Sequence, residues 1–226
     1  MRGRSVVWSV VVVGVLVAGA AVADGVVRER TQETLSTSLH TGIVGLDSAP
    51  DVTIGGFPFL TQVLAGQLDD VTVTAPAATL DGLRLQQVDV HLTGVSTSQP
   101  TVARSARLTA VASVADIEAA LAVPVDLAIQ GDALVTSATV LGLALDVVLE
   151  PRPAGRAIEV DVAGLSLAGV SVPTDELPAA LRDQLTGLRI PVDGLPQGME
   201  LTEVEVQPDG VRLTAEGTDV VFDTTS

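Results

Sequence analysis

One short pattern recurs along this chain and limits the folds that it can adopt. A glycine is followed within a few residues by Leu-x-x-Val-x-Val. The pattern occurs in four segments: Gly66–Val73, Gly82–Val90, Gly164–Val172 and Gly198–Val206. Alternating valines give one apolar and one polar face, as in a β-strand, and the wider gap after Leu is typical of a turn or bulge at strand entry. Because the copies are irregularly spaced, we interpret them as a strand-entry device reused around a large antiparallel sheet.

Further strands and a few helices complete the predicted fold. Strands are predicted at Asp51–Ile54, Ala106–Val114, Val125–Gln130, Leu143–Glu150 and Ala157–Val162, with a hairpin turn at Gln207–Gly210. Helices are predicted at residues 24–42, from Pro58 to Ala65 with Gly66 ending it, from Ile117 to Ala122 with Asp116 as its cap, and at Asp175–Leu185 with the stripe Leu177, Leu181 and Leu185. This order predicts an α+β fold that is dominated by a long antiparallel sheet.

The first 23 residues have the layout of an export signal. Met1–Arg4 is basic, Ser5–Ala23 is uncharged, and a small-x-small cleavage site precedes Asp24. This is the three-part pattern of a secretory signal peptide, and a stretch of this length could also remain as an uncleaved membrane anchor. Both alternatives place residues 24–226, which we expect to form a single domain, at the outer face of the cytoplasmic membrane or in a periplasm-like envelope space.

Charge and composition exclude several classes of partner and chemistry. The net charge is −16, and all twelve cationic residues are arginines. Such a surface repels phosphate backbones, so nucleic acid is not expected as a partner, and no polybasic patch is available to grip anionic lipids. Cysteine is absent, which excludes disulfides and thiolate chemistry.

We find no catalytic apparatus in the sequence. The only two histidines are fifty residues apart, and His91 is expected to be partly buried on a strand. No nucleophile elbow, clustered metal ligands or phosphate-binding glycine motif is present. The carboxylate pairs Asp69-Asp70, Asp175-Glu176 and Glu203 with Glu205 lack the aromatic cleft that a glycosidase needs. The sequence therefore predicts a non-enzyme that uses no metal or cofactor.

What remains is an unusually aliphatic interior, which leaves two alternatives open. Only Trp8, Phe57, Phe59 and Phe222 are aromatic, while apolar residues make up 47% of the chain. The inward side chains either fill an ordinary core or line an elongated cavity for acyl chains. Burial gains roughly 0.8 kcal/mol per methylene, so a tail of about 16 carbons would gain on the order of 10 kcal/mol.

One segment resembles a known family. The run Val52–Val73, and within it Gly56–Gln62 (Gly-Phe-Pro-Phe-Leu-Thr-Gln), resembles the LmeA-like phospholipid-binding proteins of the actinobacterial envelope. Shorter stretches are also similar: Gly131-Asp132, Leu149–Arg152 and Gly210–Gly217. The resemblance implies a fold like that of the tubular, BPI-like lipid-binding proteins, in which a long, strongly curved sheet wraps a helix and leaves an apolar tunnel. It also implies a link to phospholipid and to upkeep of an envelope mannosyltransferase.

From this resemblance we expect an exported phospholipid-binding protein that works at a membrane surface. Its ligand would be a phospholipid or another acyl-chain lipid. The candidate cavity residues are Phe57, Phe59 and Leu60 at one end, with Val63 and Leu64 on the helix behind them. The alternative is that the two phenylalanines only plug the end of the sheet, and that the chain is a non-enzymatic interaction or scaffold domain with a filled core. Three arginines could pair with a lipid phosphate: Arg84, Arg104 and Arg107.

Overall fold

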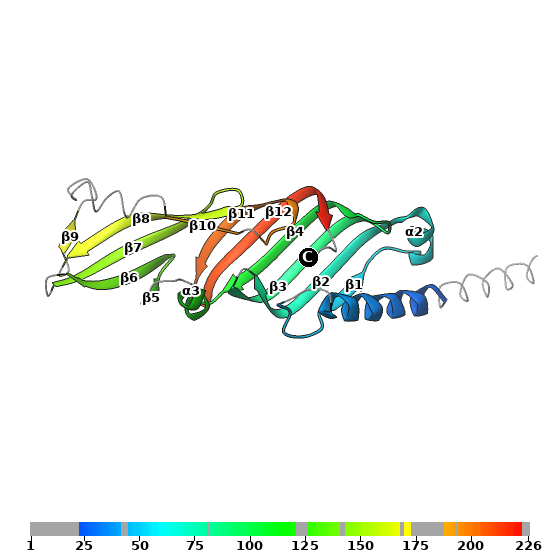
Figure 1. The fold of residues 1–226 in the computed structure, drawn as a ribbon, viewed down its shortest axis with the longest axis horizontal. Helices are drawn as coiled ribbons and strands as arrows, with labels where there is room; N and C mark the ends of the chain where they lie inside the picture. Colours follow the sequence, from blue (N-terminus) through cyan, green and yellow to red (C-terminus); the bar gives the residue numbers. More distant parts are fainter. Residues whose placement is uncertain are drawn as a thin grey trace, which may run out of the picture.

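The computed structural model describes residues 23–41, 45–80, 82–120, 126–140, 143–167, 170–172, 188–192 and 194–222. The apolar segment up to Val22 and the predicted helix Asp175–Leu185 lie outside these residues. The described part is elongated, with two sheets arranged end to end along its long axis (Figure 1).

The strands divide between two sheets, and every pair of strands is antiparallel within the described ranges. The first sheet has the order β1 (Asp51–Ile54), β2 (Gln67–Leu80), β3 (Leu83–Ser96), β4 (Thr101–Ala112), β12 (Gly210–Phe222) and β11 (Gln197–Gln207). The second has the order β10 (Leu188–Pro191), β8 (Ala157–Leu167), β7 (Leu143–Pro153), β6 (Ala133–Val140) and β5 (Leu127–Gln130), with β9 (Val170–Val172) on β8. The described helices are few: residues 23–41, α2 (Phe59–Ala65) and α3 (Val114–Ala120).

The predicted α+β chain dominated by antiparallel sheet is confirmed. The sequence indicated one long sheet, whereas the strands form two open ones. The N-terminal helix lies alongside the β1 edge of the first sheet (Figure 1). The BPI-like wrapping and its apolar cavity stay predictions.

The first sheet is amphipathic across its whole width. Side chains alternate between the two faces along each strand, and the register aligns residues of like character in rows that cross all six strands. One apolar row consists of Val52, Val73, Val90, Leu108, Ala215 and Leu201. The adjacent row, on the opposite face, consists of Thr53, Thr72, His91, Arg107, Glu216 and Glu200. The next row on the apolar face consists of Ile54, Val71, Leu92, Ala106, Gly217 and Met199.

The recurring glycine pattern marks strand entry in three of its four copies. Strands β2 and β3 begin directly after Gly66 and Gly82, and Gly198 is the second residue of β11. The predicted bulge after Leu is found in β3 between Gln86 and Asp89, and in β11 between Leu201 and Glu203. In the remaining copy, at Gly164, the glycine does not mark the entry of a strand. Gly164 lies inside β8, and the two valines of that copy form β9, which folds back antiparallel onto β8.

Two local predictions are corrected. Helix α3 begins at Val114 and is capped by Ser113, not by Asp116: the N–H of Asp116 donates to the Ser113 hydroxyl (3.2 Å), which donates to the Asp116 carboxylate (2.6 Å). This Ser-x-x-Asp pattern is a capping box, in which the acidic residue occupies the third helical position. The predicted strand Ala106–Val114 corresponds to β4, which starts earlier, at Thr101. It ends at Ala112 because Ser113 already caps the next helix.

Helix α2 and the hairpin turn follow the prediction. Gly66 adopts a left-handed conformation (φ 76°) after Ala65 and ends α2, as a glycine can without strain. Pro58 lies one residue before the helix, at its N-cap. The turn between Gln207 and Gly210 joins β11 to β12.

A small set of contacts joins the two sheets. The N–H of Leu201 in β11 donates to the carbonyl of Gly155 (2.7 Å), in the turn between β7 and β8. The neighbouring Arg156 guanidinium donates to three carbonyl oxygens just before and within the start of β11: Leu195 (2.5 Å), Pro196 (3.0 Å) and Met199 (3.3 Å). One arginine therefore fixes this join.

Candidate functional site

The N-terminal helix is attached to the first sheet by a polar stripe. Asp24, Arg28, Gln32 and Ser36 recur every fourth residue, so they lie along one side of the helix. Gln32 accepts the N–H of Ile54 (2.9 Å), and the Ser36 hydroxyl donates to the Pro50 carbonyl (2.5 Å). These bonds occupy the outward N–H of Ile54 in β1, the edge strand of its sheet, and the carbonyl of Pro50 just before that strand. We call these four residues the anchor stripe.

The first residue of the anchor stripe caps α2. The N-cap residue of α2 is Pro58, which makes no side-chain capping bond. The Asp24 carboxylate instead accepts the N–H groups of Leu60 (2.7 Å) and Phe59 (3.0 Å), and Arg28 donates to the same carboxylate (3.2 Å). The hydrogen bond from Leu60, followed by those from Phe59 and Arg28, lowers the pKa of Asp24 below its ordinary value of 3.8, against the opposing effect of burial.

We expect this cap to make helix attachment dependent on pH. Because the folded pKa is lowered, the stabilisation is complete above the unfolded value of 3.8 and is lost as the pH falls through the lower folded value. Asp24→Asn should melt about 2–4 °C below the parent at pH 7, as loss of a helix cap does. In thermal melts followed by circular dichroism, that gap should narrow as the pH falls from 5 to 3. A gap that stays constant over this range would contradict the proposed role of the charge.

The five predicted cavity residues do not share one surface. Phe59 is buried (1% exposed) and lies under the Arg28 guanidinium, which is 6.0 Å from the ring centroid. Phe57 and Leu64 are exposed to 69% and 89%, and Leu60 and Val63 are also exposed. The structure therefore brings four of them together on the outside of α2 and its preceding loop, and it separates Phe59 from them.

The apolar face of the first sheet is incompletely covered in its middle. In the row that starts at Val52, the end residues Val52, Ala215 and Leu201 are buried. The central residues Val73, Val90 and Leu108 are only half-buried. Other half-buried aliphatic side chains also pack against the core: Val88, Val204 and Val206. This incompletely covered aliphatic strip is the part of the face that can accept more apolar contact.

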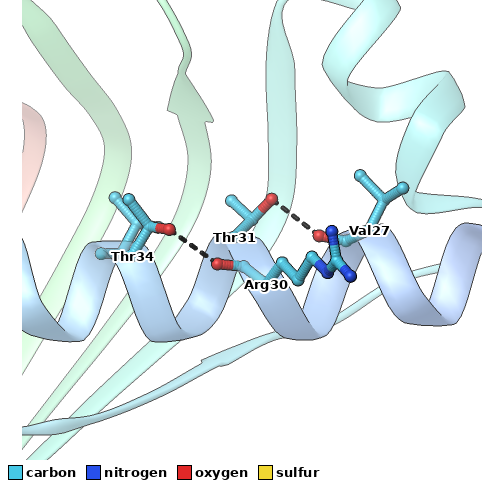
Figure 2. A pocket seen from close by; sticks show the side chains of 5 residues that line it. Val27, Arg30, Thr31 and Thr34 are labelled. Atoms are coloured by element: carbon cyan, nitrogen blue, oxygen red, sulfur yellow. Dashed lines mark hydrogen bonds between the residues drawn. The ribbon is translucent and has the colours of Figure 1, made fainter.

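A second apolar surface is a groove on the N-terminal helix (Figure 2). It has a volume of about 290 Å³ and is lined by Val27, Arg30, Thr31, Thr34 and Leu35. The hydroxyls of Thr31 and Thr34 donate to the carbonyls one turn earlier, at 2.9 and 2.8 Å. Because these hydroxyls are already satisfied, the threonines offer mainly their methyl groups. The volume is just below the usual range for small-molecule pockets, so the groove can hold only part of a lipid.

The three arginines suggested as phosphate partners are already engaged. Arg84 pairs with Asp47 (2.5 Å), and Arg107 on the polar face pairs with Glu216 (2.6 Å). Arg104 donates to the Gln67 side chain (3.4 Å). Arg30 lines the apolar groove, and the sequence did not predict this because nothing in its local pattern marks the residue.

His91 lies on a strand, as predicted, and its side chain is half-exposed on the polar face because its neighbours Val90 and Leu92 occupy the apolar face. Its Nε2 lies 3.1 Å from the Asp70 carboxylate, and its Nδ1 lies 3.2 Å from the Thr72 hydroxyl. The trio has the residue types of a hydrolase triad. However, Thr72 and His91 pair on both sides within the sheet, so their backbone N–H groups are not available to stabilise an oxyanion. We interpret the trio as polar pairing between strands.

The part of the chain that the structure describes contains no helix long and apolar enough to cross a membrane. Within that part, no three or more His, Asp or Glu side chains are grouped so that they could hold a metal ion.

Comparison with known proteins agrees with the amphipathic sheet. No curated protein and no solved structure matches the chain. The model of a family described as LmeA-like phospholipid-binding matches residues 19–216. The match includes the Gly56–Gln62 run, α2 and the whole apolar row of the first sheet. Since it extends over most of the 226 residues, the chain belongs to the LmeA-like phospholipid-binding family.

Proposed function

We propose that this protein binds a phospholipid outside the cytoplasmic membrane, with the acyl chains lying on the apolar face of the first sheet. The observation that carries the proposal is the incompletely covered middle of an otherwise buried apolar row, at Val73, Val90 and Leu108. An acyl chain that covered these side chains would gain roughly 0.8 kcal/mol per methylene removed from water. Membership of a phospholipid-binding family supports the same ligand class.

The location is part of the proposal. A basic start, an uncharged stretch from Ser5 to Ala23 and a small-residue cleavage site favour export. Residues 24–226 would then act as one domain beside the outer face of the membrane, which supplies phospholipid. By binding this lipid, the protein would support envelope lipid or lipoglycan metabolism.

The test asks whether the protein retains phospholipid and whether the apolar face of the first sheet binds it. The full chain would be extracted from bacterial membranes in mild detergent and analysed by native mass spectrometry. We expect a species that carries phospholipid, and we expect Val73→Thr with Val90→Thr to reduce its occupancy at least tenfold. The two side chains are cross-strand partners on the apolar face, and each added hydroxyl costs about 1–3 kcal/mol when an acyl chain buries it.

A matched control lies one residue away on the opposite face. Thr72→Val makes the reverse exchange next to Val73 and also breaks the contact with His91, and it should leave lipid occupancy unchanged. Equal loss in both variants would point to a general folding defect. A protein free of lipid, with no uptake from added phosphatidylglycerol, would favour the alternative of a scaffold domain with a filled core.

A further inference from the structure

The exposed apolar side chains of this protein gather at one end. Seven large apolar residues are exposed in the described part of the chain, and Val170 alone of these lies far away, on β9. The others belong to the start of the N-terminal helix and to α2 with its preceding loop: Val26, Val27, Phe57, Leu60, Val63 and Leu64. These two elements lie together at one tip of the elongated molecule, and β9 lies at the opposite tip (Figure 1).

The α2 part of the tip also lacks charge, in a protein that is otherwise strongly acidic, whereas the start of the N-terminal helix carries Asp24, Arg28, Glu29 and Arg30. From Gly55 to Leu68 the sequence contains no ionisable side chain. With a net charge of −16, most of the surface is repelled by anionic lipid head groups. The neutral apolar segment with α2 is therefore the part of the tip that can approach such a membrane closely, since interfacial binding scales with the apolar area that is buried.

The chain itself brings this tip to the membrane. The uncharged stretch Ser5–Ala23 ends one residue before Asp24. Asp24 is hydrogen-bonded to the N–H groups of Phe59 and Leu60. If a membrane retains that stretch as an anchor, the first turn of α2 in the folded domain therefore lies next to the membrane.

We propose that Phe57, Leu60, Val63 and Leu64, here called the tip patch, dock into the outer surface of a phospholipid bilayer. This inference rests on the proposed function and adds to it the surface through which the protein meets its lipid source. The apolar side chains enter the region between head groups and acyl chains. The anchor stripe holds α2 in the orientation that presents them.

The absence of cysteine allows a clean test in the full chain. Leu64→Cys and Val170→Cys each place one environment-sensitive fluorophore on an exposed apolar position, at opposite tips. Both proteins would be reconstituted with vesicles of phosphatidylcholine and phosphatidylglycerol that carry nitroxide-labelled lipids. We expect quenching at position 64 to be about threefold stronger than at position 170, or more, because apolar faces of interfacial helices sink roughly 5–10 Å into the membrane.

A second variant tests the patch itself. This variant carries the fluorophore at Val63→Cys together with the substitutions Phe57→Gln and Leu64→Gln. Its quenching should fall to the level measured at position 170. Equal, weak quenching at positions 64 and 170 would overturn the proposal. So would a fluorescence shift at position 64 that needs only a higher protein concentration and no vesicles, since that result would indicate a second copy of the chain. Phospholipid retained in native mass spectrometry alongside an unquenched position 64 would reject the tip patch alone and leave the proposed function standing.

Discussion

We expect Phe59→Ala to lower the free energy of unfolding by about 3–5 kcal/mol, the usual cost of removing a buried aromatic side chain. Phe59 is among the largest fully buried side chains of the described residues. Its ring packs in the main core cluster and lies below the Arg28 guanidinium. At about 2–4 °C per kcal/mol for a chain of this size, the melting temperature should fall by about 6–20 °C.

Phe57 supplies the matched control, because it is the same residue type two positions away. Its side chain is 69% exposed, so Phe57→Ala should change the free energy of unfolding by less than about 0.5 kcal/mol. Urea denaturation followed by circular dichroism measures both values. Similar stabilities for the two variants would mean that Phe59 is not part of the core. The sequence left open whether Phe59 plugs the end of the sheet or lines a lipid cavity. Phospholipid retained by a folded Phe59→Ala protein would favour the plugging role, and loss of phospholipid would favour the cavity role.

Replacing Arg156 by Met should cost about 3 kcal/mol of unfolding free energy. Methionine keeps much of the side-chain length but removes the guanidinium donor from the carbonyls of Leu195, Pro196 and Met199, of which Pro196 still accepts the N–H of Met199. Hydrogen bonds that involve a charged group contribute about 1.5–3 kcal/mol. The loss falls on the join between the two sheets, so we expect protection from hydrogen exchange to drop first around Gly155 and Leu201.

The control for Arg156 is Arg152→Met on the neighbouring strand. Arg152 is 60% exposed and pairs with Asp161 across the sheet. Exposed ion pairs contribute less than about 1 kcal/mol, so this variant should be nearly as stable as the parent. If Arg152→Met were as damaging as Arg156→Met, the effect would come from lost charge in general and not from the join.

The regular part of the fold could be predicted because its causes are local. Alternating Val in Gly82–Val90 predicts a strand, and the extra residue after Leu85 predicts the bulge that β3 contains. Gly66 ends α2 because glycine tolerates a positive φ. The helix cap at Ser113 was missed although its motif is local, because Asp116 is itself a good capping residue and the reciprocal bond between the two shows only in three dimensions.

The candidate site could be predicted only in part, because it depends on contacts between distant residues. Asp24 and Leu60 are 36 residues apart, and nothing near either of them indicates that one caps the helix of the other. The same holds for Arg156, whose partners lie about 40 residues further on. The motif Gly56–Gln62 singled out this segment but could not show that Phe59 is buried while Phe57 and Leu64 are exposed.

The N-terminal helix contacts the outer edge of β1 through side chains, and under the proposed export this bears on the order of events during secretion. An exported chain emerges from its N-terminus, so residues 23–41 are available before β1 exists. When Asp51–Ile54 follows, Gln32 and Ser36 are ready to occupy its outer hydrogen-bonding groups. If the chain is exported as proposed, these two bonds would hinder the edge of β1 from pairing with a neighbouring nascent chain as it leaves the translocation channel.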